Sequence, residues 1–271
     1  MGIDIEVGSA GFVREEEVKM KDKFAKGVTV HCADMTLHIN GSGEISTSEN
    51  NHTQPRIRAK WANRNQPRPI FHSFIDSVLP DQAVRTLVQQ YIGYTLIEDA
   101  RFEVAQWWYG SGYGKSVLAD IVGALHVSAA VLNSPKTIGG FGTEDLIDAS
   151  LVTLNLASNR VDFQVLKLAI SGCEMLFQRK YKKSLVAAMT AKWLVLCDTK
   201  PSSGLDEGMM MRRLQMIHFE QRFEDRNNAL HLLNAICKDE LGGVLNWAVE
   251  GLVQVMEAGG FSALPEDTRA A

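Results

Sequence analysis

The sequence contains few cysteines and no long hydrophobic run. Its four cysteines, Cys32, Cys173, Cys197 and Cys237, are widely spaced and form no pair with metal-ligand spacing. We therefore expect reduced thiols rather than a disulfide framework or a zinc site. No apolar stretch approaches the roughly 20 residues of a membrane-spanning helix, and the first residues lack the basic-then-apolar order of a signal peptide. We expect a cytoplasmic protein without a membrane partner.

The chain also lacks a strong excess of charge of either sign. Lys and Arg together number 28 and Asp and Glu number 32, which gives a net charge of −4 over 271 residues. This balance argues against general coating of nucleic acid but is compatible with a local basic patch. The length and the 45% hydrophobic content suit one α/β domain of ordinary size with a smaller helical region.

The most informative segment covers residues 101–126, with the sequence RFEVAQWWYGSGYGKSVLADIVGALH. An apolar run leads into a glycine turn, a Gly-Lys-Ser sequence and an amphipathic helix, which is the order of a phosphate-binding loop. Glycines let backbone N–H groups close around phosphate oxygens, the lysine adds positive charge, and the hydroxyl can ligate magnesium. Ser116 is therefore also the predicted metal ligand. The predicted phosphate-binding residues are Gly110, Gly112, Gly114, Lys115 and Ser116.

This loop is one residue shorter than the usual pattern, which has four residues between its first glycine and the Gly-Lys pair. Gly110 and Gly114 enclose only three residues, so a strict count puts Tyr109 at the first-glycine position. The alternative is an ordinary glycine turn in which Ser116 caps a helix, since serine is a common cap. Phosphate binding is favoured because the strand, the glycines, Gly-Lys-Ser and the helix coincide.

Sequence patterns divide the chain into four predicted parts. Residues 1–66 are turn-rich with short β-like pieces, and we expect an irregular leader or the remnant of an upstream region. Residues 67–98 carry two helical apolar patterns that precede a core at residues 99–228, which contains the predicted phosphate-binding loop. Residues 229–271 are expected to be a helical C-terminal segment.

Apolar runs typical of buried strands recur after the glycine turn. Their separation by helices and long crossovers predicts an α/β fold of the P-loop type, with a mostly parallel sheet covered by helices on both faces. Ligands of such sheets bind at the carboxyl ends of the strands, where the glycine turn is also expected. The runs cover residues 151–156, 193–197 and 214–219.

In this order, the segments resemble the superfamily 3 helicase module of phage and plasmid primase-helicases, an AAA+ type ATPase related to the poxvirus primase-helicase. The likeness extends from about residue 69 to residue 265 and includes GSGYGKS, LVTLN, WLVLCDTKP and ELGGVLNWAVEGL. It implies an ATP-driven DNA helicase for phage or plasmid replication, with ATP and Mg²⁺ as cofactors. It also implies a homo-oligomeric ring, expected to be a hexamer, that acts on single-stranded DNA. A primase supplied by another chain is a further expected partner.

The resemblance assigns catalytic roles to several residues. Lys115 would contact the β and γ phosphates of ATP, and Ser116 would contact magnesium. Arg212 or Arg213 would act as an arginine finger on the nucleotide of a neighbouring subunit, where it neutralises charge on the transferring phosphoryl group. A surface arginine pair without a catalytic role is the ordinary alternative.

A basic run, QRKYKK, starts at Gln178. In the family this segment contacts DNA, and its mixture of cations with one aromatic suits a loop that grips a single-stranded backbone and stacks a base. A solvated charged loop is the alternative. The predicted DNA-binding residues are Arg179, Lys180, Lys182 and Lys183.

Two positions depart from the catalytic pattern of the family. The family has an acidic residue at the end of the second strand, where it polarises water and helps to hold magnesium, but here Asn155 is followed by Leu156. The sensor strand usually ends in Asn and here ends in Asp198, which cannot donate a hydrogen bond when ionised. Asp198 is a candidate catalytic residue or magnesium ligand, or else a turn residue. If another carboxylate replaces the missing acid, Asp148 is the first candidate.

These departures keep a second function open. The chain would then be a catalytically impaired P-loop relative that acts as a DNA-binding or assembly subunit. A small-molecule kinase with the same loop is a weaker alternative, because such an enzyme needs neither the basic run nor the arginine pair.

Overall fold

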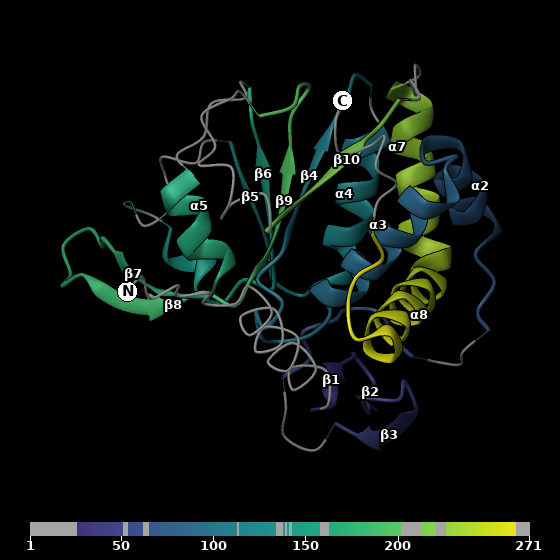
Figure 1. Cartoon of the computed structure of the whole chain (residues 1–271), viewed down its shortest axis with the longest axis horizontal. Coiled ribbons are helices and arrows are strands. Elements are labelled where there is room, and N and C mark those ends of the chain that lie inside the picture. Colours follow the sequence, from purple (N-terminus) through teal and green to yellow (C-terminus); the bar gives the residue numbers. More distant parts are fainter. Residues whose placement is uncertain are drawn as a thin grey trace, which may run out of the picture.

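A parallel sheet of five strands lies at the centre of the protein, with helices on both of its faces (Figure 1). In this computed structural model the order of the strands is β10-β4-β9-β6-β5, and every neighbouring pair is parallel. The fold is therefore α/β, as the sequence predicts. The strands are β4 (Ala105–Tyr109), β5 (Ala129–Leu132), β6 (Leu151–Asn155), β9 (Lys192–Leu196) and β10 (Leu214–His218). The structure describes residues 26–50, 54–61, 65–112, 114–133, 138, 140, 143–157, 163–201, 213–220 and 226–263.

The two central strands are buried along their whole length. Every residue of β4 and of β9 is buried, as expected for strands that are covered on both faces. Alternate side chains enter two different cores: Trp108 and Leu194 face one core, whereas Trp107 and Trp193 face the other. The sheet therefore separates two apolar layers.

The chain order places a topological switch point between β4 and β9. β4 leads to β5 at one side of the sheet, whereas β9 leads to β10 in the opposite direction. In open α/β sheets, ligands bind in the crevice at the carboxyl ends of two such strands. We call the side of the sheet where the strands end the carboxyl edge, and the opposite side the amino edge.

Most of the helices pack on one face of the sheet (Figure 1). α3 and α8 cross so closely that a Cβ atom at Gly93 would lie 2.4 Å from the Ala248 carbonyl oxygen, and one at Gly251 would lie 2.3 Å from that of Gln89. Among the described ranges, each helix is too short or too polar to cross a membrane. The helices of this face are α2 (Pro69–Val78), α3 (Gln82–Thr95), α4 (Gly114–Leu125), α7 (Arg226–Ala235), the π-helical turn η3 (Ile236–Glu240) and α8 (Leu241–Ala258).

The opposite face packs against α5 (Phe163–Ile170), which a two-stranded hairpin follows along the chain. The hairpin consists of β7 (Glu174–Phe177) and β8 (Leu185–Ala188), and a short 3-10 helix, η2 (Glu144–Leu146), precedes β6. Figure 1 shows the hairpin extending away from the central sheet. Since it connects the end of α5 to the start of β9, it is attached at the amino edge.

Residues 26–50 contain a small sheet, in the region where the sequence predicts short β-like pieces. β1 (Val28–His31), β2 (Met35–Ile39) and β3 (Ile45–Glu49) form an antiparallel sheet. Val30 and Leu37 are fully buried and belong to the same core as α3, α4 and α8. The alternation of apolar and polar residues in these short strands explains how one face of this small sheet joins the core.

Candidate functional site

The glycine loop, described for residues 110–112, follows β4 at the carboxyl edge and precedes α4. Gly110 and Gly112 both have φ of 118°, a backbone conformation that residues with side chains rarely adopt. A Cβ atom at Gly110 would also lie 2.2 Å from the Phe219 carbonyl oxygen. The Gly110 N–H donates to the Asp198 carbonyl at 3.2 Å, so the loop is fixed to the segment that follows β9.

Lys115, the second residue of α4, is 4% exposed. Its Nζ donates to the Gly110 carbonyl and lies 3.7 Å from Asp198 Oδ1. Burial lowers the pKa of Lys115, and the Asp198 carboxylate opposes this shift. The ammonium group and the N-terminus of α4 place positive charge at the same point, an arrangement that favours an anion.

A pocket of about 470 Å³ lies beside this ammonium group. Its size is within the range of small-molecule sites, about 300–1,000 Å³. Three of the predicted phosphate-binding residues line it together with Asp198. The lining residues of this pocket, the Lys115 pocket, are Gly112, Lys115, Ser116, Asn155, Leu156, Leu196, Cys197 and Asp198. Leu196 and Cys197 were not predicted as site residues from the sequence, although both belong to the apolar run that precedes Asp198.

The end of β6 contributes no acid to this pocket. Leu156 packs against the core on the α5 face, and its N–H donates to the Leu196 carbonyl at 2.8 Å. Asn155 contributes an amide, which lies 3.5 Å from Asn133 Oδ1. Of the lining residues, Asp198 is the one that carries a carboxylate, and its side chain is 89% exposed.

Asp148 lies away from the Lys115 pocket. It is exposed and precedes β6, two residues before Ser150, whose N–H donates to the Ser128 carbonyl ahead of β5. Asp148 therefore lies at the amino edge, on the opposite side of the sheet from Lys115. This position excludes it as a substitute for the missing acid within its own chain.

Arg213 also lies at the amino edge, immediately before β10. Its Nη2 donates to Glu103 Oε2 at 2.7 Å and its Nε donates to Ser171 Oγ at 3.1 Å. These contacts connect the start of β10 to the segments before β4 and after α5, a stabilising role. Arg212 lies outside the described residues. An arginine finger would act on a neighbouring subunit, so this role stays a prediction.

The basic run forms the tip of the β7–β8 hairpin. Tyr181 is 93% exposed and has φ of 62°, and Lys180 Nζ lies 5.3 Å from the centre of its ring. Arg179 Nε donates to the Lys183 carbonyl at 2.9 Å, which closes the tip. Lys182 is exposed beside them. An exposed aromatic among cations suits a single-stranded nucleic acid, and this tip belongs to the opposite edge of the sheet from Lys115.

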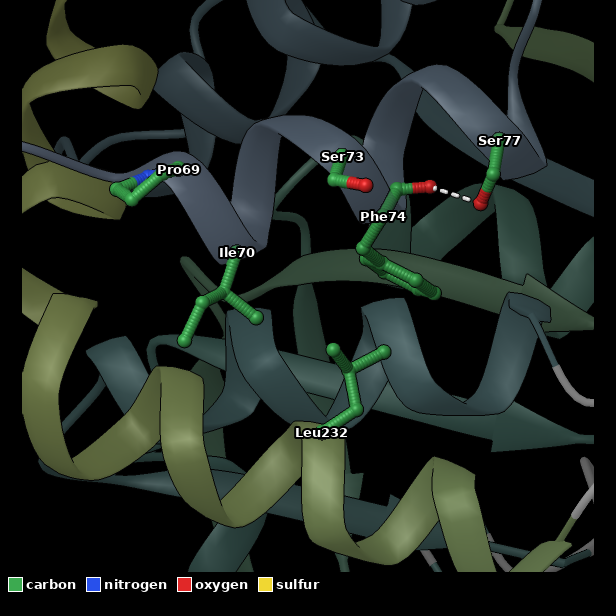
Figure 2. A pocket seen from close by; sticks show the side chains of 6 residues that line it. All are labelled: Pro69, Ile70, Ser73, Phe74, Ser77 and Leu232. Atoms are coloured by element: carbon green, nitrogen blue, oxygen red, sulfur yellow. Dashed lines mark hydrogen bonds between the residues drawn. The ribbon is translucent and has the colours of Figure 1, made fainter.

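A second hollow of about 460 Å³ lies between α2 and α7 (Figure 2). Ile70 and Phe74 point into it from α2, and Leu232 points into it from α7. None of its lining residues carries a charge, so it has no group that would balance a phosphate. The lining residues are Pro69, Ile70, Ser73, Phe74, Ser77 and Leu232. The Lys115 pocket, which combines a buried lysine with the glycine loop and the start of α4, is the candidate site.

No family model and no curated protein matches the sequence. Solved structures do match, at low sequence identity. The A form apo structure of the NrS-1 C-terminal region has a TM-score of 0.54 at 13% identity, covering 93% of this chain and 73% of that one. A second A form structure gives 0.53 at 16% identity, covering 82% and 56%. Another apo structure gives 0.53 at 12% identity, covering 93% and 76%. At these identities, the likeness shows a shared fold.

Proposed function

We propose that this chain is a P-loop nucleotide-binding module of the primase-helicase class, with a role in the replication of a phage-type or plasmid-type element. The observation that carries the proposal is the position of Lys115 and the N-terminus of α4 beside a pocket at the switch point of the sheet. The resemblance of the sequence motifs to phage and plasmid primase-helicases supports this class, and the fold shared with the NrS-1 C-terminal region is compatible with it.

In this proposal the Lys115 pocket binds the phosphates of ATP. The loop glycines allow backbone N–H groups to approach the phosphates, and Lys115 compensates their charge. The Ser116 hydroxyl would ligate Mg²⁺, which helps to neutralise charge that develops on the phosphates during transfer. The buried position of Lys115 strengthens its interaction with an anion, because screening by water is weak there.

The residues of this pocket suit nucleotide binding with slow hydrolysis better than the fast ATP hydrolysis of an active helicase. Phosphoryl transfer depends on positioning and charge compensation, and a single stabilising group such as an arginine finger can contribute about 10³ to 10⁵ in rate. Leu156 can neither orient a water molecule nor accept its proton. We therefore favour a nucleotide-binding, DNA-binding relative of the helicases over a fully active helicase.

The second proposed ligand is single-stranded DNA, bound at the tip of the β7–β8 hairpin. Lys180, Lys182 and Lys183 would contact the phosphate backbone while Tyr181 stacks on a base. Assembly as a ring, expected to be a hexamer, would bring several tips to one strand.

Binding of a fluorescent ATP analogue and release of phosphate, each with and without single-stranded DNA, test this function. We expect nucleotide binding that Lys115→Ala abolishes and that Lys238→Ala, an exposed lysine in η3, leaves unchanged. DNA-stimulated turnover at a helicase rate would show a fully active motor instead. Binding that does not depend on Lys115, or phosphorylation of a small metabolite, would contradict the proposal.

A further inference from the structure

The Lys115 pocket has an unusual distribution of charge for a nucleotide site. The end of β6, where the resembled family has an acid, provides an amide and a leucine, Asn155 and Leu156. The carboxylate of the pocket is instead that of Asp198, just after the neighbouring strand β9. This carboxylate lies 3.7 Å from Lys115 Nζ, the group that a phosphate would need.

The oxygen donors of the pocket fit Mg²⁺ only when phosphates are also present. Mg²⁺ is usually held by one or two protein carboxylates together with substrate phosphates and water. Here the side-chain oxygens are those of the Asp198 carboxylate, the Ser116 hydroxyl and the Asn155 amide, and Asp198 is the charged one. Within the described ranges, no group of three or more His, Cys, Asp or Glu side chains could hold a metal ion by itself. The metal would therefore enter with the nucleotide.

We propose that Asp198 makes nucleotide binding at the Lys115 pocket dependent on Mg²⁺. Without the metal, the carboxylate repels the phosphates and pairs with Lys115. With the metal, the same carboxylate is the protein group that faces the ion, and the repulsion becomes an attraction. This inference rests on the proposed nucleotide site and assigns to β9 a role that the resembled family gives to the end of β6.

The position of Asp198 supports both parts of this role. Its backbone is fixed, because its carbonyl accepts the Gly110 N–H at 3.2 Å. Its side chain is 89% exposed, so the carboxylate can turn from Lys115 towards an ion that arrives from solvent. Exposure also weakens the pair with Lys115, so we expect an effect of about tenfold on affinity rather than complete exclusion of nucleotide.

The test compares binding of a fluorescent ADP analogue in EDTA and in Mg²⁺. We expect the wild-type affinity to rise about tenfold with Mg²⁺. In EDTA, Asp198→Asn should bind the analogue about tenfold more tightly than wild type. Its affinity should rise less than about twofold when Mg²⁺ is added. Asp198→Glu retains the charge and should retain the dependence on Mg²⁺. Asp148→Asn, the same change at the amino edge, is the matched control and should behave as wild type.

The outcomes distinguish this inference from the proposed function. If wild type binds the analogue through Lys115 but Asp198→Asn shows the same response to Mg²⁺, the role of Asp198 is wrong and the nucleotide site stands. A weaker affinity of Asp198→Asn in EDTA would also overturn the inference. If wild type shows no Lys115-dependent binding in either condition, both proposals fail. Thermal unfolding of each variant confirms that the compared proteins are folded.

Discussion

Two buried lysines at opposite edges of the sheet lie in very different surroundings. Lys115, at the carboxyl edge, faces the glycine loop and a pocket. Lys192, at the amino edge, is 1% exposed, donates to the carbonyl groups of Ile97 and Thr190, and lies 5.1 Å from the centre of the Tyr94 ring. The first lysine borders space for a ligand, whereas the second is enclosed by its own chain.

The same contrast extends to the neighbours of the two lysines. At the amino edge, His126 is fully buried between the hydroxyl groups of Thr95 and Ser150, at 3.1 Å and 2.9 Å. At the carboxyl edge, Asp198 is mostly exposed. Burial of a charged group therefore does not identify a site by itself. An adjoining pocket at the carboxyl ends of the strands is the more informative sign.

The largest expected effect tests the catalytic capacity of the carboxyl edge. We expect wild-type hydrolysis of ATP near background, because Leu156 cannot polarise water and the glycine loop is short. Leu156→Glu combined with insertion of one residue between Gly112 and Gly114 should raise turnover about a thousandfold, far more than either change alone. Steady-state phosphate release with and without single-stranded DNA measures this. An unmodified rate of about 1 per second or faster would contradict the prediction.

The next effect tests whether burial changes the protonation of Lys192. Burial lowers its pKa from 10.5 to about 7. Between these pH values Lys192 is protonated in the unfolded chain but not in the folded chain. The free energy of unfolding should therefore rise with pH, by at most about 1.4 kcal/mol per pH unit. Lys192→Met should remove this rise, whereas Lys238→Met should retain it. Urea unfolding at pH 7, 8 and 9 measures the slope, and equal slopes in all three proteins would show that Lys192 stays charged.

Much of the fold could be predicted from the sequence, because the long apolar elements have clear patterns. The runs at 151–156, 193–197 and 214–219 are confirmed as β6, β9 and β10. The helical patterns after residue 69 and after residue 229 are confirmed as well. β5 was missed because it has four residues of alternating exposure. The hairpin strands were missed for the same reason, since both are short and mostly exposed.

The site could be predicted only where residues share one edge of the sheet. Lys115, Ser116 and Asp198 follow the ends of β4 and β9, so the rule for parallel sheets brings them together. Arg213 could not be placed in this way, since its partner Glu103 is 110 residues distant in sequence and no local pattern pairs them. The burial of Lys192 could have been considered from the sequence, because a lysine at the start of a wholly apolar strand must be buried or extend its side chain to solvent.

A smaller effect is expected for His126, the second enclosed base of the amino edge. Burial lowers its pKa from 6.5 to about 3, and the nearby charges of Lys192 and Arg56 act in the same direction. The unfolded chain therefore binds more protons between these values, and the free energy of unfolding should fall as pH falls from about 6.5 towards 3. His126→Asn should lessen this loss, and His231→Asn, an exposed change in α7, should not. Urea unfolding between pH 6.5 and 4 measures the difference, and an unaltered loss in His126→Asn would contradict it.

The smallest expected effect concerns the one part of the amino edge that we propose to bind a ligand. The hairpin tip differs from the enclosed groups beside it, because Tyr181, Lys182 and Lys183 are exposed. Each lysine that contacts a phosphate releases counterions, so Lys182→Ala with Lys183→Ala should reduce the slope of log affinity against log salt by roughly 0.7 per lost contact on a single strand. Lys238→Ala, which removes an exposed charge elsewhere, should leave the slope unchanged. Titration of a fluorescent single strand at several salt concentrations measures the slopes. An unchanged slope in the double variant would remove these lysines from the DNA path and leave the amino edge wholly structural.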